Sequence, residues 1–151
     1  MSLRVATTAD IPDIMKMCHG CHQEVPYETF PVNEEKAEAS IQEYILEENR
    51  LVLLAEDEEG SFGVLIGFAA PLFYSDSYQA YELLWWVKPE KRKKKDAVRL
   101  FLAYEYWAKK LGCRSIQTSM VHGWPELEEF YTRRGYMKTE TSFRKVLWES
   151  K

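Results

Sequence analysis

A stretch near the middle of the chain reads Leu84-Trp85-Trp86-Val87-Lys88-Pro89-Glu90-Lys91-Arg92-Lys93-Lys94-Lys95-Asp96-Ala97. It begins as an apolar strand, turns at Pro89 and continues into a helix. The first turn of a helix leaves backbone N–H groups unpaired and carries the positive end of the helix dipole, so it attracts anions. Arg92 and the neighbouring lysines add positive charge. The stretch therefore predicts a phosphate-binding turn between a strand and a long helix.

The rest of the chain alternates between helical and strand patterns. Apolar residues spaced as on one helical face extend the helix to Leu111, and Gly112 can close it. Strand patterns cover 3–7, 51–55, 62–74, 78–87 and 115–121, and one or two more strands are expected within 136–148. Shorter helices are predicted over 10–23, after a cap at Asn33, and from Pro125 to Gly135. This order predicts a mixed sheet of the α/β (α+β) class flanked by helices.

The bulk composition describes one ordinary globular domain. The chain has 151 residues, of which 46% are hydrophobic, and dividing it would leave two marginal cores. We therefore expect residues 1–151 to form a single domain. The formal net charge is −4, which argues against a nucleic-acid-binding protein, although residues 88–95 form a local basic patch. The alternative interpretation of that patch is a solvated loop.

The cysteines and the N-terminus indicate a cytoplasmic protein. Cys18, Cys21 and Cys113 are an odd number, and the first residues lack the apolar stretch of a signal peptide. No apolar run approaches the roughly 18 residues of a membrane helix. We expect reduced thiols, a cytoplasmic location and no membrane partner.

The central stretch resembles the signature of the GNAT N-acetyltransferases, in which a strand and a Val-x-Pro-Glu turn lead to Arg-Gly-x-Gly-x-Gly/Ala at the start of a helix. Val87, Pro89, Glu90, Arg92 and Ala97 match it. A second match is Glu129-Phe130-Tyr131-Thr132-Arg133-Arg134-Gly135-Tyr136, which is similar to the family's late helix. The order of elements also agrees, so the resemblance covers nearly the whole chain.

The resemblance implies a mostly antiparallel central sheet and transfer of an acetyl or other acyl group from acetyl-coenzyme A to a primary amine, by direct attack of the amine. Acetyl-coenzyme A would be a co-substrate, and no metal is implied. The acceptor would be a small-molecule or peptide amine, and members of the family often pair as homodimers. Residues matching the coenzyme-binding positions are Trp85 and Val87 for the pantetheine arm, and Arg92, Lys93, Lys94, Lys95, Asp96 and Ala97 for the pyrophosphate.

The phosphate turn departs from the family pattern at two positions. Lys93 and Lys95 stand where the family usually has glycine. Glycine lets the backbone approach a pyrophosphate closely, whereas a side chain crowds the ligand or restricts φ. The lysine ammonium groups can offset this loss by ion pairing, but they are mobile point charges rather than a fixed row of amides.

Glu82 and Tyr131 are the candidate catalytic residues. An amine is protonated at neutral pH, so a base must remove a proton, and Glu82 lies in the strand leading to the turn. The alternative is a strand glutamate that faces solvent or pairs with a lysine, and His122 is the reserve base. Tyr131 matches the family tyrosine that can stabilise or protonate the leaving thiolate. Alternatively, it forms part of the apolar face of a short helix.

Cys18-His19-Gly20-Cys21-His22 matches the Cys-x-x-Cys-His pattern of haem attachment and suggests a zinc site. Haem attachment requires an export context that the N-terminus does not supply, and a closed zinc site within five consecutive residues is cramped. We therefore expect no metal.

Two functions from different classes follow. The first is an active N-acetyltransferase. The second is a catalytically inactive GNAT-like module that uses the basic 88–95 patch to bind an acidic partner, with binding that weakens steeply as salt increases.

Overall fold

The computed structural model describes residues 2–25, 30–93, 95–120 and 125–147. The strands are β1 (Ser2–Val5), β2 (Arg50–Asp57), β3 (Gly60–Pro71), β4 (Tyr78–Val87) and β5 (Ser115–Gln117). The α-helices are α1 (Ile11–Glu24), α2 (Glu34–Leu46), α3 (Lys95–Leu111) and α4 (Pro125–Arg133). Two short 3-10 helices, η1 (Thr8–Asp10) and η2 (Pro89–Lys91), precede α1 and α3.

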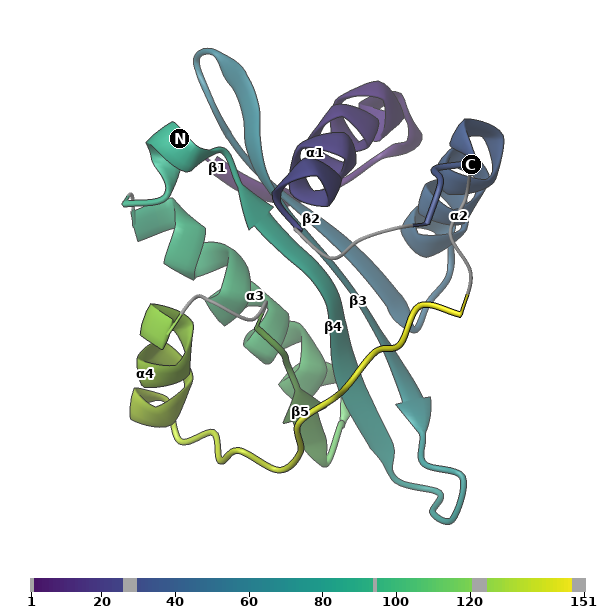
Figure 1. The fold of residues 1–151 in the computed structure, drawn as a ribbon, viewed down its shortest axis with the longest axis vertical. Coiled ribbons are helices and arrows are strands. Elements are labelled where there is room, and N and C mark those ends of the chain that lie inside the picture. Colours follow the sequence, from purple (N-terminus) through teal and green to yellow (C-terminus); the bar gives the residue numbers. More distant parts are fainter. Residues whose placement is uncertain (1, 26–29, 94, 121–124, 148–151) are drawn as a thin grey trace.

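The strands form one sheet in the order β1-β2-β3-β4-β5. Strands β1 to β4 are antiparallel neighbours, and β5 is parallel to β4. Helices α1 and α2 cover one face of the sheet, and α3 and α4 cover the other (Figure 1). The predicted mixed, mostly antiparallel sheet flanked by helices is confirmed.

Strand β3 lies at the centre of the core because it is buried on both faces. Val64 and Ile66 pack with α1 and α2, whereas Leu65 packs in the cluster that includes Leu100 and Phe101 of α3. A continuous apolar sequence, as in this strand, is typical of burial on both faces.

Local signals at the helix ends also agree with the sequence. The Asn33 side chain accepts a hydrogen bond from the Lys36 N–H at 3.0 Å and caps α2. Gly112 has φ +86°, a left-handed conformation that ends α3. The helix predicted over 10–23 is α1, and Asp10 precedes it. The Asp10 carboxylate binds Arg4 and the Thr7 N–H rather than the α1 amides.

The predicted C-terminal strands are wrong for the described part of the chain. Strand β5 ends at Gln117 rather than near residue 121, and residues 136–147 form no strand. The charged residues of 138–145 are exposed, and so are the apolar side chains of Met137, Phe143 and Leu147, so the segment lacks the burial that stabilises an added strand. It contacts β5 through side chains, with Gln117 donating to Glu140 at 3.3 Å.

A β-bulge interrupts β4 at Leu83. Ile66 of β3 pairs with Leu84, whereas the next residue, Gly67, pairs with Glu82, so Leu83 is an extra residue. In a regular strand, residues 82 and 85 point to opposite faces. The extra residue puts the side chains of Glu82 and Trp85 on the same face, toward α3 and α4.

Gly67 has no room for a side chain opposite this bulge. A Cβ there would lie 2.9 Å from the Tyr81 carbonyl oxygen and 3.1 Å from the ring of Tyr104, which is fully buried. Because neither the strand backbone nor a buried ring can move aside freely, we expect Gly67→Ala to lower the free energy of unfolding by about 1–3 kcal/mol. Urea denaturation measures this, and a change within about 0.5 kcal/mol would contradict the packing described.

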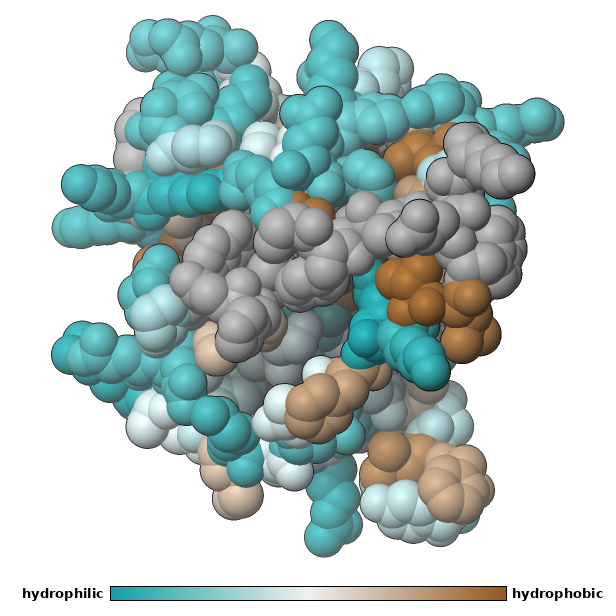
Figure 2. Space-filling view, viewed as in Figure 1, coloured by the Kyte–Doolittle hydropathy of each residue, from teal (hydrophilic) through white to brown (hydrophobic). Residues whose placement is uncertain are grey.

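The surface in Figure 2 is mostly hydrophilic, with apolar side chains gathered at its lower right, where the β3–β4 hairpin ends. Phe73 is fully exposed in this turn and Tyr74 is largely exposed. No helix within the described ranges combines the length and apolar character needed to cross a membrane.

Candidate active site

Strands β4 and β5 separate at the middle of β4. They pair only at Gln79, Ala80 and Tyr81, and β4 continues to Val87 while β5 ends at Gln117. From Glu82 onward, β4 therefore has no strand partner on that side within the described residues. Such an unpaired strand edge offers backbone hydrogen-bonding groups to an extended ligand.

Glu82 lies at the point where the strands separate. Its carboxylate oxygen Oε2 accepts a hydrogen bond from the Thr118 hydroxyl at 2.9 Å, and the Ser119 N–H also donates to the carboxylate. Burial raises the pKa of Glu82 to about 7, although these two hydrogen bonds oppose the rise. A carboxyl group with this pKa can accept and release a proton near neutral pH.

Tyr131 reaches the same point from α4. Its hydroxyl oxygen is 3.1 Å from the Thr118 hydroxyl oxygen and donates to the Ser119 carbonyl oxygen at 3.1 Å. Burial is the main cause that raises the pKa of Tyr131 above its usual range, and the charge of Glu82 adds to it. Tyr131 thus stays protonated at neutral pH, and Thr118 links it to Glu82. The reserve base, His122, lies outside the described residues.

The ring of Tyr131 is held by an aromatic cluster. Phe101 of α3 lies at its centre, with ring centroids 5.5 Å from Tyr131 and 5.0 Å from Trp85. Tyr104, Phe130 and Tyr136 also contact the Phe101 ring. Phe130 and Tyr131 do form an apolar helix face, as the alternative interpretation stated, and the Tyr131 hydroxyl nevertheless reaches the Glu82 site.

The predicted phosphate turn joins β4 to α3. Arg92 is the first basic residue of the signature, and its guanidinium is directed at α1. It donates to both carboxylate oxygens of Glu24 at 2.7 and 2.8 Å, and to the Val87 carbonyl oxygen at 2.8 Å. The Trp86 indole N–H also donates to Glu24 at 3.1 Å. The arginine side chain therefore fixes the turn against the end of α1.

Lys93 and Lys95 are exposed at the start of α3 and present positive charge there. Asp96 and Ala97 are buried, so the Asp96 carboxylate faces the core and not the surface where an anion would approach. One carboxylate oxygen of Asp96 has no hydrogen-bond partner within the described residues. Lys94 lies outside those residues.

Trp85 and Val87 are the predicted pantetheine-side residues, and both side chains point into the core on the α3 side. The Trp85 indole N–H donates to the Ala97 carbonyl oxygen at 3.2 Å and ties β4 to the first turn of α3. Their backbone groups lie on the part of β4 beyond its pairing with β5. The predicted base, acid and phosphate turn are thus carried by one strand and the two helices beside it.

The model of the acetyltransferase (GNAT) family matches residues 15–136. The chain belongs to the GNAT acetyltransferase family. Both sequence matches, the turn from Val87 to Ala97 and the segment around Tyr131, fall within the matched residues. A comparison with curated proteins finds no significant match.

Solved structures of similar fold include other GNAT proteins. An aminoglycoside 6'-N-acetyltransferase from Acinetobacter haemolyticus has 19% identity and a TM-score of 0.74, covering 100% of this chain and 98% of its own. A protein from Bacillus halodurans has 18% identity and a TM-score of 0.80 over 97% and 100% of the two chains. An aminoglycoside acetyltransferase from an uncultured soil sample, solved with sisomicin, has 14% identity and a TM-score of 0.76 over 97% and 96%. At sequence identities this low, the structural similarity shows that the fold is shared and nothing more.

Thr118 is the site residue that the sequence did not reveal in this GNAT chain. It follows β5 in a segment predicted to be strand, and nothing in its sequence context marks a hydroxyl role. Its importance comes from the geometry, because it contacts both candidate catalytic residues. The one feature of the sequence that could have indicated Thr118 is that its side chain is polar and lies toward the end of the predicted strand.

The Cys18–His22 pattern lies within α1. Burial raises the pKa of the Cys18 and Cys21 thiols to about 11. His19 pairs with Glu34 at 2.7 Å. Within the described part of the chain, no three His, Cys, Asp or Glu side chains gather as a metal site.

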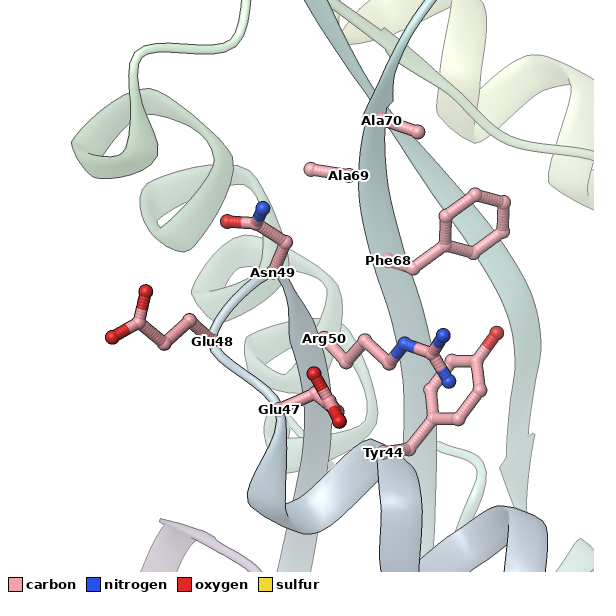
Figure 3. Close-up of a pocket in the computed structure, with 8 residues that line it drawn as sticks. All are labelled: Tyr44, Glu47, Glu48, Asn49, Arg50, Phe68, Ala69 and Ala70. Carbon is pink, nitrogen blue, oxygen red and sulfur yellow. The ribbon is translucent and has the colours of Figure 1, made fainter.

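A cavity lies away from Glu82, between the end of α2 and the β2–β3 pair (Figure 3). Its volume is about 610 Å³, and its lining includes Glu47, Glu48 and the rings of Tyr44 and Phe68. Phe68 stacks on Tyr81, the neighbour of Glu82, with ring centroids 4.8 Å apart. The cavity thus adjoins the strand that carries Glu82, but neither Glu82 nor Tyr131 lines it.

Proposed function

We propose that the chain acts as one N-acetyltransferase domain that transfers the acetyl group of acetyl-coenzyme A to a primary amine by direct attack. The observation that carries this proposal is the contact of Glu82 and Tyr131 with Thr118, at the point where β4 and β5 separate. A base and an acid on opposite sides of one hydroxyl group suit a reaction in which one atom loses a proton and another gains one.

Glu82 is proposed as the general base. An amine becomes a nucleophile only after it loses a proton, and the pKa of about 7 lets the Glu82 carboxylate accept that proton at neutral pH. By exposed area the residue as a whole is half-buried, while its surroundings desolvate the carboxyl group enough to raise its pKa. The bulge at Leu83 supports this role because it sets the Glu82 side chain beside Thr118.

Tyr131 is proposed as the group that assists departure of the thiolate. A phenol is protonated at neutral pH and burial raises the pKa of Tyr131 further, so its hydroxyl has a hydrogen to donate to a developing negative charge. Acetyl-coenzyme A supplies the thioester carbon that the amine attacks and the sulfur that leaves.

The turn at the start of α3 fits the pyrophosphate of coenzyme A. The first-turn amides and the exposed side chains of Lys93 and Lys95 favour an anion, and the buried Asp96 carboxylate is withdrawn from it. Arg92 would hold the turn through Glu24. The unpaired β4 edge around Trp85 and Val87 would take the extended pantetheine arm.

The acceptor proposed for this chain is an amine. The cavity beside Phe68 combines aromatic rings with the carboxylates of Glu47 and Glu48, and Arg50, whose guanidinium carbon lies 4.6 Å from the centre of the Tyr44 ring, also lines it. Two of the structural neighbours are aminoglycoside acetyltransferases, and aminoglycosides carry several amino groups. We therefore include an aminoglycoside among the amines to be tested.

Calorimetric titration with acetyl-coenzyme A tests this proposal. We expect a dissociation constant between about 1 µM and 1 mM, and release of free thiol when spermidine, tyramine or sisomicin is added. Absence of binding at millimolar acetyl-coenzyme A would overturn the proposal. If association with a polyanion such as heparin were then found and weakened steeply with salt, the exposed Lys93 and Lys95 would instead support the binding module described above.

A further inference from the structure

The Thr118 hydroxyl has a single hydrogen but two partners within hydrogen-bonding distance. Glu82 Oε2 is 2.9 Å away and the Tyr131 hydroxyl oxygen is 3.1 Å away. A hydroxyl donates one hydrogen and accepts up to two. Thr118 can therefore donate to only one of the two partners at a time, and the other contact must run in the opposite direction or be lost.

The charge of Glu82 decides which partner receives the Thr118 hydrogen. An ionised carboxylate only accepts, so it takes the hydrogen of Thr118. A protonated Glu82 can donate to Thr118, whose own hydrogen then turns to the Tyr131 oxygen. Tyr131 can accept it because its hydrogen is directed at the Ser119 carbonyl oxygen, 3.1 Å away. The three side chains thus have two hydrogen arrangements, selected by the protonation of Glu82.

We propose that Thr118 is a positioning residue that relays the proton removed from the amine at Glu82 to Tyr131, and so couples the base to the acid. This inference rests on the acetyltransferase function proposed above. Thr118 acts through its two neighbours and need not touch either substrate.

The proton balance of the reaction closes through this relay. An ammonium substrate first loses one proton, which Glu82 passes to solvent. In the transfer step itself, the neutral amine nitrogen forms a bond to the thioester carbon, the carbon–sulfur bond breaks, and the nitrogen gives its second proton to Glu82. Glu82 returns that proton to Thr118, Thr118 passes its own hydrogen to Tyr131, and Tyr131 gives its hydrogen to the leaving thiolate. All three side chains end as they began, and the net change is one proton moved from nitrogen to sulfur.

The relay also explains how Tyr131 can act although it is a weak acid. A thiol has a pKa of about 8.5, so a phenol whose pKa is raised by burial does not give up its proton to a thiolate unaided. The transfer becomes favourable when a proton from Glu82, with a pKa of about 7, replaces it at once. Without Thr118 the replacement has no route within the described residues.

Thr118→Val and Thr118→Ser form the matched pair of variants that test the relay. Valine keeps the shape but lacks the hydroxyl, whereas serine keeps the hydroxyl. With sisomicin, spermidine or tyramine as acceptor, we expect Thr118→Val to lower kcat on the order of 10- to 100-fold. We expect its KM for acetyl-coenzyme A to stay within about threefold, and Thr118→Ser to retain most of the wild-type kcat.

The double variant with Tyr131→Phe separates a relay from two independent effects. If the proton passes from Thr118 to Tyr131, either single change breaks the same path, so Thr118→Val should cost little further kcat in the Tyr131→Phe background. An equal loss in both backgrounds, or an unchanged kcat in Thr118→Val, would overturn the relay.

A measurement on the ligand-free protein remains decisive even if no acceptor is turned over. The ¹³Cζ resonance of Tyr131, followed by NMR, should shift as Glu82 titrates near pH 7 in the wild type and in Thr118→Ser. In Thr118→Val the amplitude of this step should fall by at least about half. A step of unchanged amplitude would show that Thr118 does not couple the two groups, whereas failure of the acetyltransferase proposal appears separately as lack of acetyl-coenzyme A binding.

Discussion

Glu82→Gln is expected to lower kcat for acetyl transfer by about 10²- to 10⁴-fold, because a glutamine amide cannot accept a proton from the amine. The substitution keeps the shape of the side chain, and its amide oxygen can still accept from Thr118 and from the Ser119 N–H. Binding of acetyl-coenzyme A should therefore change little. Thiol release at saturating acceptor measures kcat, and titration of acetyl-coenzyme A measures its affinity.

The pH dependence of the rate tests whether Glu82 acts as a base. Glu82 works as a base only when ionised, so the wild-type rate should rise with pH through about 7 and fall on the acid side. This rise of the rate near pH 7, the acid limb of the pH–rate profile, should be absent in Glu82→Gln. Two amines with different pKa values distinguish this limb from titration of the acceptor, because only the enzyme's limb stays at the same pH.

Stability shows whether the loss of rate reflects a damaged fold. The pKa of Glu82 rises from 4.5 to about 7 on folding, so the folded state resists ionisation of this carboxyl. Below the unfolded-state pKa, Glu82 is protonated in both the folded and the unfolded state, so it costs the folded state no stability. Above about pH 7 the full penalty is present, and it amounts to up to about 3 kcal/mol.

Glu82→Gln removes that penalty, so at pH 8 the variant should be more stable than the wild type, and the difference should disappear toward pH 4. Thermal or urea unfolding at several pH values measures it. Glu58→Gln, in the exposed β2–β3 turn, is the matched control and should change neither kcat nor stability. Wild-type kcat in Glu82→Gln would remove Glu82 from the mechanism.

The scaffold of this site could be predicted because its signals are local. The spacing of its apolar residues and Gly112 predict the helix from Lys95 to Leu111. A run of apolar residues predicts the strand that ends at Val87. The family match could be predicted for the same reason, since a strand, a basic turn and a helix are adjacent in sequence.

The details that decide the chemistry depend on contacts between distant segments. The bulge at Leu83 arises from the pairing of β4 with β3 and has no signature in the sequence of β4. The contact of Thr118 with Glu82 spans 36 residues, and that of Arg92 with Glu24 spans 68. No periodicity within a strand or helix encodes such a contact, so these partners emerge only from the folded chain.

The second large effect is expected at Phe101, and it concerns the support behind Tyr131. Phe101 has no exposed surface, and it touches the rings of Trp85, Tyr104, Phe130, Tyr131 and Tyr136. We expect Phe101→Ala to lower the free energy of unfolding by about 3–5 kcal/mol, because it removes the buried ring and leaves a cavity between α3, α4 and β4. Guanidinium denaturation measures the loss.

Phe143→Ala provides the control, since that ring is 95% exposed and its removal should change stability by less than about 0.5 kcal/mol. A loss under about 1 kcal/mol in Phe101→Ala would mean that the aromatic rings close the space by themselves.

Phe101→Leu extends the test from stability to catalysis. Leucine fills much of the volume and should leave a folded protein, but it does not support the Tyr131 ring in the same position. Because the Tyr131 hydroxyl must stay within reach of Thr118 at 3.1 Å, kcat should fall in Phe101→Leu more than the affinity for acetyl-coenzyme A does. Equal loss of kcat and affinity would indicate general disorder of the site. A selective loss of kcat would show that the core cluster holds the acid in place, and that stability and catalysis share Phe101.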